Sequence, residues 1–175
     1  MTILPEISPQ RIAGLTAVSA FLIFTFIAFL NYPGYDFTSQ FLSELGTGPG
    51  AVWFNAGLML SGICLAAFFM QLMKKYHAMS MAGILCGLAL SGIGIFPLPQ
   101  EPAHGIMAAL FFVLAGTTLL IFAFRNARKK RIPAFFSLVA VAADVVYILL
   151  RDPVTQKIAI GLFVIALCAI VIQEE

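Results

Sequence analysis

Long apolar runs dominate the chain, and short polar connections separate them. The runs carry almost no formal charge, and they lie at residues 12–31, 53–73, 78–100, 102–124, 132–150 and 158–173. A helix needs about 20 apolar residues to cross the hydrocarbon core of a bilayer. The first five runs have that length, and the sixth reaches it from residue 154 if the ammonium group of Lys157 extends to the membrane surface. The pattern therefore predicts six membrane-spanning helices, the last over 154–173.

The composition supports this interpretation. Of the 175 residues, 61% are hydrophobic and only 10% are charged, and the mean hydropathy is +1.01. A soluble domain of this size could not bury so much apolar surface in one core, and the same figures exclude a disordered chain. The runs do not alternate apolar and polar residues as barrel strands do. We expect an all-α, polytopic six-helix bundle that forms a single domain over 1–175.

Lysine and arginine are distributed unequally between the two sides of this arrangement. With the N-terminus inside, the inner side receives eight of them (Arg11, Lys74, Lys75, Arg125, Arg128, Lys129, Lys130 and Arg131), and the outer side receives Arg151 and Lys157. Cytoplasmic connections carry such an excess, so both termini are predicted to be cytoplasmic. The net charge of +2 is too small to indicate a nucleic-acid partner.

The longest connection, residues 32–52, is predicted to lie on the outer side. Asp36 suits a helix N-cap and Gly46 suits the position after a helix end. Between them, apolar residues recur at a spacing of four, at Phe37, Phe41 and Leu45. This pattern predicts a short amphipathic helix over 37–45 at the membrane surface. Glu44 would then lie near the end of that helix, where the helix dipole disfavours an anion, so we expect it to have a partner.

The other two outer connections also carry polar residues. His104 follows Glu101-Pro102 in the first turn of the fourth span, where the helix dipole favours a neutral imidazole that can act as a base. Asp144, Tyr147 and Arg151 share one face of the fifth span, and a carboxyl group inside a span usually faces the protein interior or water. The unusual polar residues therefore gather in the outer third: Asp36, Ser39, Ser43, Glu44, Asn55, Glu101, His104, Asp144, Arg151 and Asp152.

Two functions are consistent with this cluster. The first is the binding or handling of a lipid or another amphiphile at the outer leaflet, with Asp36, Asn55, Asp144, Tyr147 and Asp152 as further ligand contacts and Arg151 at a phosphate. The second is a membrane-embedded lipid hydrolase or transferase with His104 as base. Its nucleophile would be Ser39 or Ser43, and its orienting acid Asp36, Glu44 or Asp152.

A third hypothesis is a small proton-coupled transporter with Asp144 as its relay. The spans offer few polar steps beyond it: Ser61, Gln71, Thr117 and Thr118. An accessory subunit is a fourth reading, and a homo-oligomer is compatible with all of them. His104 is the single outer histidine, so no metal site is predicted. The sequence has no pattern for an organic cofactor. Membrane lipids are the expected partners.

Two short motifs carry a family resemblance. The first is Tyr-Pro…Phe-Leu-Ser-Glu-Leu-Gly…Trp-Phe-Asn-Ala-Gly over 32–57, and the second is Gly-Ile-Phe-Pro…His-Gly…Phe-Phe over 94–112. In these the chain resembles the DUF998 family of six-helix prokaryotic membrane proteins without an assigned activity. The resemblance implies a six-helix fold with a constrained outer face, in the plasma membrane of a prokaryote, and it supplies no catalytic residues. A fainter likeness, at Asn55, is to the Frag1/DRAM/Sfk1 group, which is associated with lipid handling.

Overall fold

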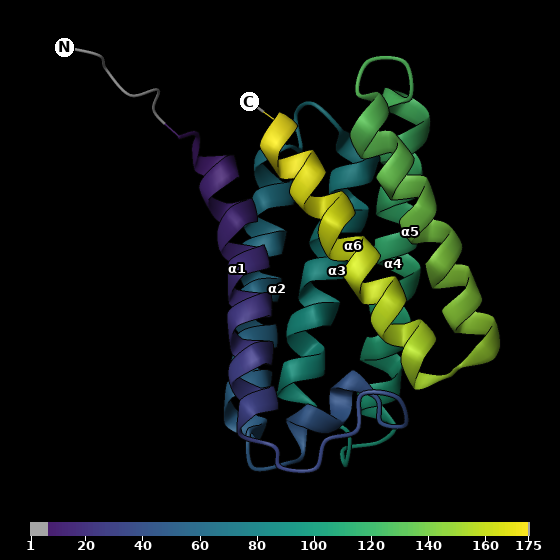
Figure 1. Cartoon of the computed structure of the whole chain (residues 1–175). Coiled ribbons are helices and arrows are strands. Elements are labelled where there is room, and N and C mark those ends of the chain that lie inside the picture. The colour runs from purple at the N-terminus through teal and green to yellow at the C-terminus, as the bar shows by residue number, and fades with distance from the viewer. Residues whose placement is uncertain (1–6, 175) are drawn as a thin grey trace.

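The computed structural model describes residues 7–174. Within that range the chain forms six long helices and one short 3-10 helix, and it contains no strand. In chain order these are α1 (Pro9–Leu30), η1 (Leu42–Gly46), α2 (Ala51–Gln71), α3 (His77–Ile95), α4 (Ala103–Asn126), α5 (Arg131–Leu150) and α6 (Pro153–Gln173) (Figure 1). The expected all-α fold with six helices is confirmed.

All six long helices are long and apolar enough to cross a membrane. The shortest, α3, has 19 residues, which corresponds to a length of about 28 Å at 1.5 Å per residue. It ends at Ile95, before the expected limit at 100. Phe96 precedes a proline and has left the helical conformation, with φ −112° and ψ 80°, because the proline ring disfavours the helical conformation in the residue before it.

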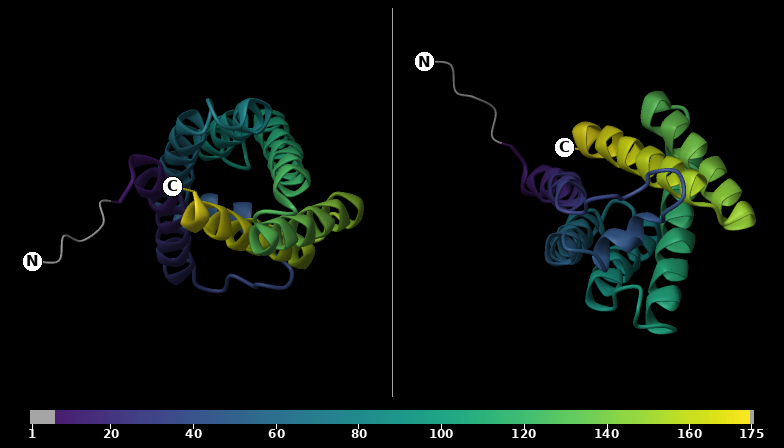
Figure 2. Two further views of the ribbon diagram at one scale, coloured as in Figure 1. Left: turned by 90° about the horizontal axis from the view of Figure 1, so that it is seen from above. Right: turned by 60° about the horizontal axis from the view of Figure 1, so that its bottom comes forward.

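The helices pack in a nearly sequential order that closes on itself. α2 packs against α1 and α3, α4 against α3, α5 against α4 and α6, and α6 returns to α1. Figure 2 shows α5 at the edge of the bundle. Both ends of the described chain lie at one end of the bundle, which we call the termini end. The connections 31–50, 96–102 and 151–152 form the opposite loop end (Figure 1).

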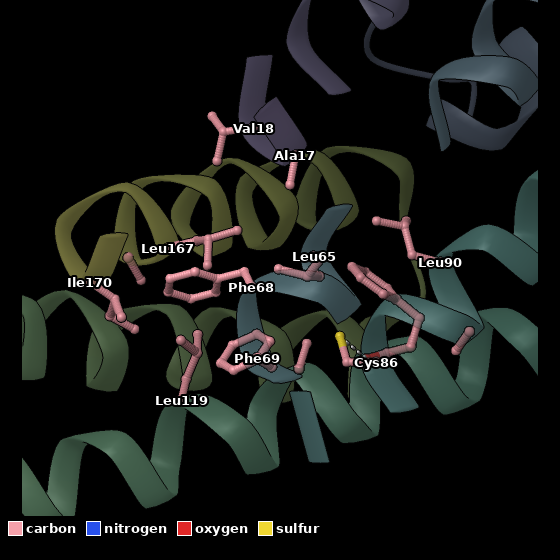
Figure 3. Close-up of a cluster of buried hydrophobic side chains, with 14 of the residues drawn as sticks. Ala17, Val18, Leu65, Phe68, Phe69, Cys86, Leu90, Leu119, Leu167 and Ile170 are labelled. Carbon is pink, nitrogen blue, oxygen red and sulfur yellow. Dashed lines mark hydrogen bonds between the residues drawn. The ribbon is translucent and has the colours of Figure 1, made fainter. Parts of the chain in front are cut away.

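The apolar core takes side chains from all six long helices. Phe68 and Phe69 of α2 lie at its centre, and Leu119 of α4 and Leu167 of α6 pack nearby (Figure 3). From α5 the buried apolar cluster receives only Ala140. The main core therefore holds α5 less firmly than the other helices.

Glu174 organises the termini end. Its carboxylate is fully buried and pairs with Lys75 at 2.8 Å and Lys130 at 2.6 Å. Lys130 also donates to the carbonyl of Gln173, and Arg11 donates to that of Ile172. Cations from two other segments, Arg11 and Lys130, thus meet the last carbonyls of α6, as the helix dipole favours. The side of the membrane on which this end lies stays a prediction.

Candidate functional site

The connection between α1 and α2, residues 31–50, differs from its sequence prediction. Residues 37–45 do not form one amphipathic helix: the backbone turns over 37–40, Phe41 is extended with ψ 153°, and η1 begins only at Leu42. Asp36 caps a local turn instead, and its carboxylate accepts hydrogen bonds from Thr38 and Ser39. Such side-chain bonds compete with helix formation.

These hydrogen bonds also set the charge of the turn. The carboxylate of Asp36 accepts from the hydroxyl and backbone N–H of Thr38, at 2.7 and 2.8 Å, and from the hydroxyl of Ser39 at 2.8 Å. They lower the pKa of Asp36 to about 2, with the hydroxyl of Thr38 as the largest cause. Asp36 is therefore an anion that is already occupied within its own loop.

Glu44 lies in the first turn of the helix that forms, not in its last turn. One carboxylate oxygen accepts from the backbone N–H of Phe41 at 2.7 Å, and the other accepts from the side-chain amide of Gln40 at 2.9 Å. A carboxylate at this position satisfies an otherwise free N–H and suits the helix dipole. Glu44 thus stabilises the loop through its contacts.

The start of α6 fastens this loop to the bundle. Gln156 is buried; its amide oxygen accepts from the backbone N–H of Leu42 at 2.8 Å, and its amide nitrogen donates to the hydroxyl of Tyr147 at 3.3 Å. Lys157 donates to the carbonyl of Gln40. Sequence reasoning missed Gln156. An amide inside an apolar span, which must find a partner there, is the signal that could have identified it.

A second contact fastens the loop from below. The side-chain amide of Asn55, at the start of α2, donates to the carbonyl of Gly46 at 3.1 Å. Asp152 is the N-cap of α6 and accepts from the backbone N–H groups of Val154 and Thr155 at 2.9 and 3.2 Å. Hydrogen bonds from Thr155 and Val154 lower the pKa of Asp152. Both residues have local structural partners.

A cavity of about 60 Å³ lies beneath the loop. Its polar lining comes from Ser43, His104 and Gln156, and its other walls are apolar. Nδ1 of His104 lies 2.8 Å from the carbonyl oxygen of Phe96. That oxygen can only accept, so Nδ1 carries a proton and donates it to the carbonyl.

The serine and histidine residues of the hydrolase hypothesis are not joined. Ser43 lines the same cavity as His104, but no hydrogen bond links their side chains in the described structure. The hydroxyl of Ser39 donates to Asp36, and Ser39 does not line this cavity. General-base activation of a hydroxyl needs such a contact, directly or through one water.

A larger groove of about 380 Å³ runs between α4 and α5. Arg151 lines it at the loop end, and its wall is otherwise largely apolar, formed by Phe41, Gly105, Ala108, Ala109, Phe112, Val113, Tyr147 and Ile148. Arg151 is exposed and forms no ion pair within residues 7–174. Its guanidinium is therefore free for a ligand.

The groove and the cavity are neighbours. Ala108 and Phe112 line both hollows, and the Phe112 ring packs against Tyr147 with 4.6 Å between ring centroids. Tyr147 in turn contacts Gln156, which lines the cavity. The aromatic pair of Phe112 and Tyr147 thus lies where the α4–α5 groove adjoins the cavity beneath the loop.

The family model of DUF998, described as a protein of unknown function, matches residues 15–172. The chain belongs to the DUF998 family. Neither the curated proteins nor the solved structures contain a match. The chain is accordingly a multi-pass membrane protein of this family.

The two motifs that carry the DUF998 resemblance meet beneath the loop. Of the residues in them, six line the 60 Å³ cavity: Leu42, Ser43 and Phe54 from the first motif, and His104, Phe111 and Phe112 from the second. They come from η1, α2 and α4. Residues of both motifs therefore meet at one place in the fold, the cavity beneath the loop.

Asp144 lines neither of these two hollows, and it lies one helical turn farther from the loop end on α5 than Tyr147. Its side chain is nine-tenths buried, and its Oδ1 atom has no hydrogen-bond partner among the described residues. A carboxyl oxygen without a partner costs about 1–3 kcal/mol of desolvation. Asp144 is the only polar residue lining a small cavity of about 10 Å³ whose other residues come from α4, α5 and α6.

No polar track leads from Asp144 toward the termini end in the described structure. The nearby hydroxyls of Thr117 and Thr118 donate to carbonyls of their own helix, those of Val113 and Leu114, both at 2.7 Å. Within residues 7–174, no three His, Cys, Asp or Glu side chains form a group that could hold a metal ion.

Proposed function

We propose that this DUF998 protein binds an amphiphile with an anionic head group in the groove between α4 and α5. The observation that carries the proposal is the unpaired guanidinium of Arg151 at one end of a largely apolar groove. A guanidinium offers a planar fork of donors that matches a phosphate or carboxylate. The apolar wall suits the chain of the same molecule.

The groove faces the surrounding lipid. Val113 of α4 is 58% exposed and Ile148 of α5 is 42% exposed, and both lie on helices that span the bilayer. Ala109 has a small side chain, so the α4 wall leaves room for an alkyl chain there. These features support lateral entry of a ligand from the membrane.

The other hypotheses have less support. The hydrolase lacks a bond between His104 and a serine in the described structure. The transporter lacks polar residues beside Asp144. A binding function requires neither, and it uses Tyr147 and Arg151 from the predicted set. We therefore retain lipid or amphiphile binding as the function.

The experiment uses a tryptophan reporter in the groove. Trp53 is the single tryptophan, so a Trp53→Phe/Val113→Trp protein carries its fluorophore in the groove. Vesicles containing brominated phosphatidylglycerol, an anionic lipid, are expected to quench it several-fold more strongly than vesicles containing brominated phosphatidylcholine. The excess should disappear in Arg151→Gln.

A matched reporter separates the groove from the bulk lipid. Ile23 of α1 is 55% exposed and lines neither the α4–α5 groove nor the cavity beneath the loop, so Trp53→Phe/Ile23→Trp should be quenched equally by the two lipids. Equal quenching at Val113→Trp as well would refute an anionic-amphiphile site in this groove.

We also propose that the loop end lies outside the cell membrane of a prokaryote and the termini end in the cytoplasm. The excess of lysine and arginine in the connections of the termini end supports this orientation. The test introduces a cysteine at Arg128 after replacement of Cys64, Cys86 and Cys168. An impermeant thiol reagent applied outside intact cells should not label it. Labelling would reverse the orientation.

A further inference from the structure

Asp144 has a buried carboxyl oxygen without a hydrogen-bond partner in the described part of the chain, and it does not line the proposed binding groove. Its Oδ1 atom is buried without a partner, and the residues around it from α4 and α6 are apolar, Phe112 and Ala159 among them. No second titratable or charged side chain lines this cavity. A buried polar atom in such surroundings calls for a hydrogen-bonding group from outside the chain.

Asp144 lies directly below the groove. Phe112 lines both the groove and the small cavity that contains Asp144. Gly116 follows Phe112 by one turn on α4, and Asp144 precedes Tyr147 by one turn on α5. Both steps lead away from the loop end, so Asp144 and Gly116 lie next to the end of the groove that is farther from the loops.

The carboxyl group of Asp144 occupies the space that a side chain at position 116 would need. A Cβ atom at position 116 would lie 2.8 Å from Oδ2 of Asp144, which is too close for any larger residue without a shift. Ala140 is the one fully buried apolar side chain that α5 gives to the core cluster, and Phe136, Val141 and Tyr147 are only partly buried against it. Contact between a ligand in the groove and Asp144 requires a small outward shift of α5.

We propose that Asp144 is the inner polar contact of the groove and binds an uncharged hydrogen-bonding group on the chain of the amphiphile. This inference rests on the proposed function, since it requires the anionic head group at Arg151. Arg151 is the residue that ends α5, in a left-handed backbone conformation with φ 51°, and it follows Asp144 by seven positions, which corresponds to about 10 Å along the helix axis. The ligand class is an anionic amphiphile with a hydroxyl group at that distance from its head.

A hydroxyl group suits either protonation state of Asp144. It donates to a carboxylate, and it both donates to and accepts from a carboxylic acid. An unsubstituted alkyl chain offers neither, so it leaves Oδ1 unpartnered. Asp144 therefore makes binding selective for the position of the hydroxyl along the chain.

The experiment compares fatty acids that differ in one hydroxyl. The Trp53→Phe/Val113→Trp protein, purified in detergent, is loaded with 9,10-dibromostearate, which quenches the reporter. Stearate, 2-hydroxystearate or 10-hydroxystearate then displaces it. In an extended chain with carbon–carbon bonds of about 1.5 Å, the hydroxyl of 10-hydroxystearate lies roughly 10 Å from the carboxylate.

We expect 10-hydroxystearate to displace the probe at an about tenfold lower concentration than stearate, the effect of one hydrogen bond to a buried group. 2-Hydroxystearate should behave like stearate. Asp144→Leu, which has a similar shape without polar atoms, should remove the preference but still bind stearate. Asp144→Asn should keep most of it.

The outcomes separate the inference from the function on which it rests. Equal displacement by stearate and 10-hydroxystearate in the reporter protein overturns the role of Asp144 and leaves the groove intact as a binding site. A preference that persists in Asp144→Leu also overturns it. Absence of quenching by the dibrominated probe overturns the groove itself. If Asp144→Leu does not fold, the comparison of the two hydroxyl positions, together with Asp144→Asn, still decides whether Asp144 binds the hydroxyl group.

Discussion

Gln156 accepts a hydrogen bond from the backbone N–H of Leu42 at 2.8 Å, across 114 positions of sequence. The same side chain donates to the hydroxyl of Tyr147 at 3.3 Å. One amide on α6 therefore holds both the loop above the cavity and the aromatic wall of the groove. The position of the loop and the shape of the groove are linked through this residue.

The first prediction concerns that link. Gln156→Leu leaves the N–H of Leu42 without its partner, so we expect a loss of about 1–3 kcal/mol in the free energy of unfolding. Amide hydrogen exchange over 41–46 should accelerate more than exchange in α2. Gln173→Leu, at the exposed end of the same helix, is the control and should change neither. Unchanged exchange over 41–46 would mean that other contacts hold the loop.

The second prediction concerns pH and the turn at Asp36. The folded pKa of Asp36, about 2, lies below its ordinary value of 3.8. The ionised carboxylate therefore stabilises the turn at pH values above 3.8, and this contribution is lost as the pH falls toward 2. The amide of Thr38 should become less protected from exchange over that interval. In Asp36→Asn its exchange, corrected for intrinsic chemistry, should show no such step.

The third prediction concerns the ion pairs at the termini end. Lys75 pairs with the buried carboxylate of Glu174, while its neighbour Lys74 is exposed and forms no ion pair in the described structure. Lys75→Gln is expected to lower the unfolding temperature, and Lys74→Gln should leave it unchanged. Similar effects of the two variants would show that the pair adds no stability, as is common for exposed pairs.

The pH dependence of this pair has the opposite sign to that of Asp36. The hydrogen bond with Glu174 raises the pKa of Lys75 above its ordinary value of 10.5. The stabilisation is complete below pH 10.5 and is lost as the pH rises through the raised value. Wild type should therefore lose unfolding temperature above pH 10.5 more steeply than Lys75→Gln.

The fourth prediction treats Asp144 as a cost to the fold. Asp144→Leu removes a buried oxygen without a partner, so the unfolding free energy should rise by about 1–3 kcal/mol. Gly116→Ala should lower it, because the new Cβ meets Oδ2 of Asp144 at 2.8 Å. In Asp144→Ala that penalty should be smaller. Thermal unfolding in one detergent measures all three, and a destabilised Asp144→Leu would contradict the prediction.

The spans were readable from the sequence because the bilayer fixes how long an apolar helix must be. The spacing of Asp144, Tyr147 and Arg151 predicted one shared helix face, but α5 ends at Leu150 and Arg151 follows it in a left-handed conformation. The helix over 37–45 was wrong because the pattern of Phe37, Phe41 and Leu45 does not register the bonds from Thr38 and Ser39 to Asp36.

Two important residues have partners that no local sequence pattern identifies. Gln156 and Glu174 find their partners 114 and 99 positions away, and no spacing rule along one helix reaches so far. The location of the groove between α4 and α5 was not predicted for the same reason, since it depends on how closely the two helices approach. Long-range packing decides these features.

The return of α6 to α1 has a consequence for how the protein is made. Lys75, Lys130 and Arg11 all find their partners at the end of α6, and the ribosome makes α6 after the other five helices. Until α6 is inserted, the earlier helices lie in the membrane without it, and those cations are solvated at the membrane surface. Assembly of this bundle is therefore completed by the joining of its earliest and latest helices, and a stalled chain that ends before α6 would expose an open seam to the cell's membrane proteases.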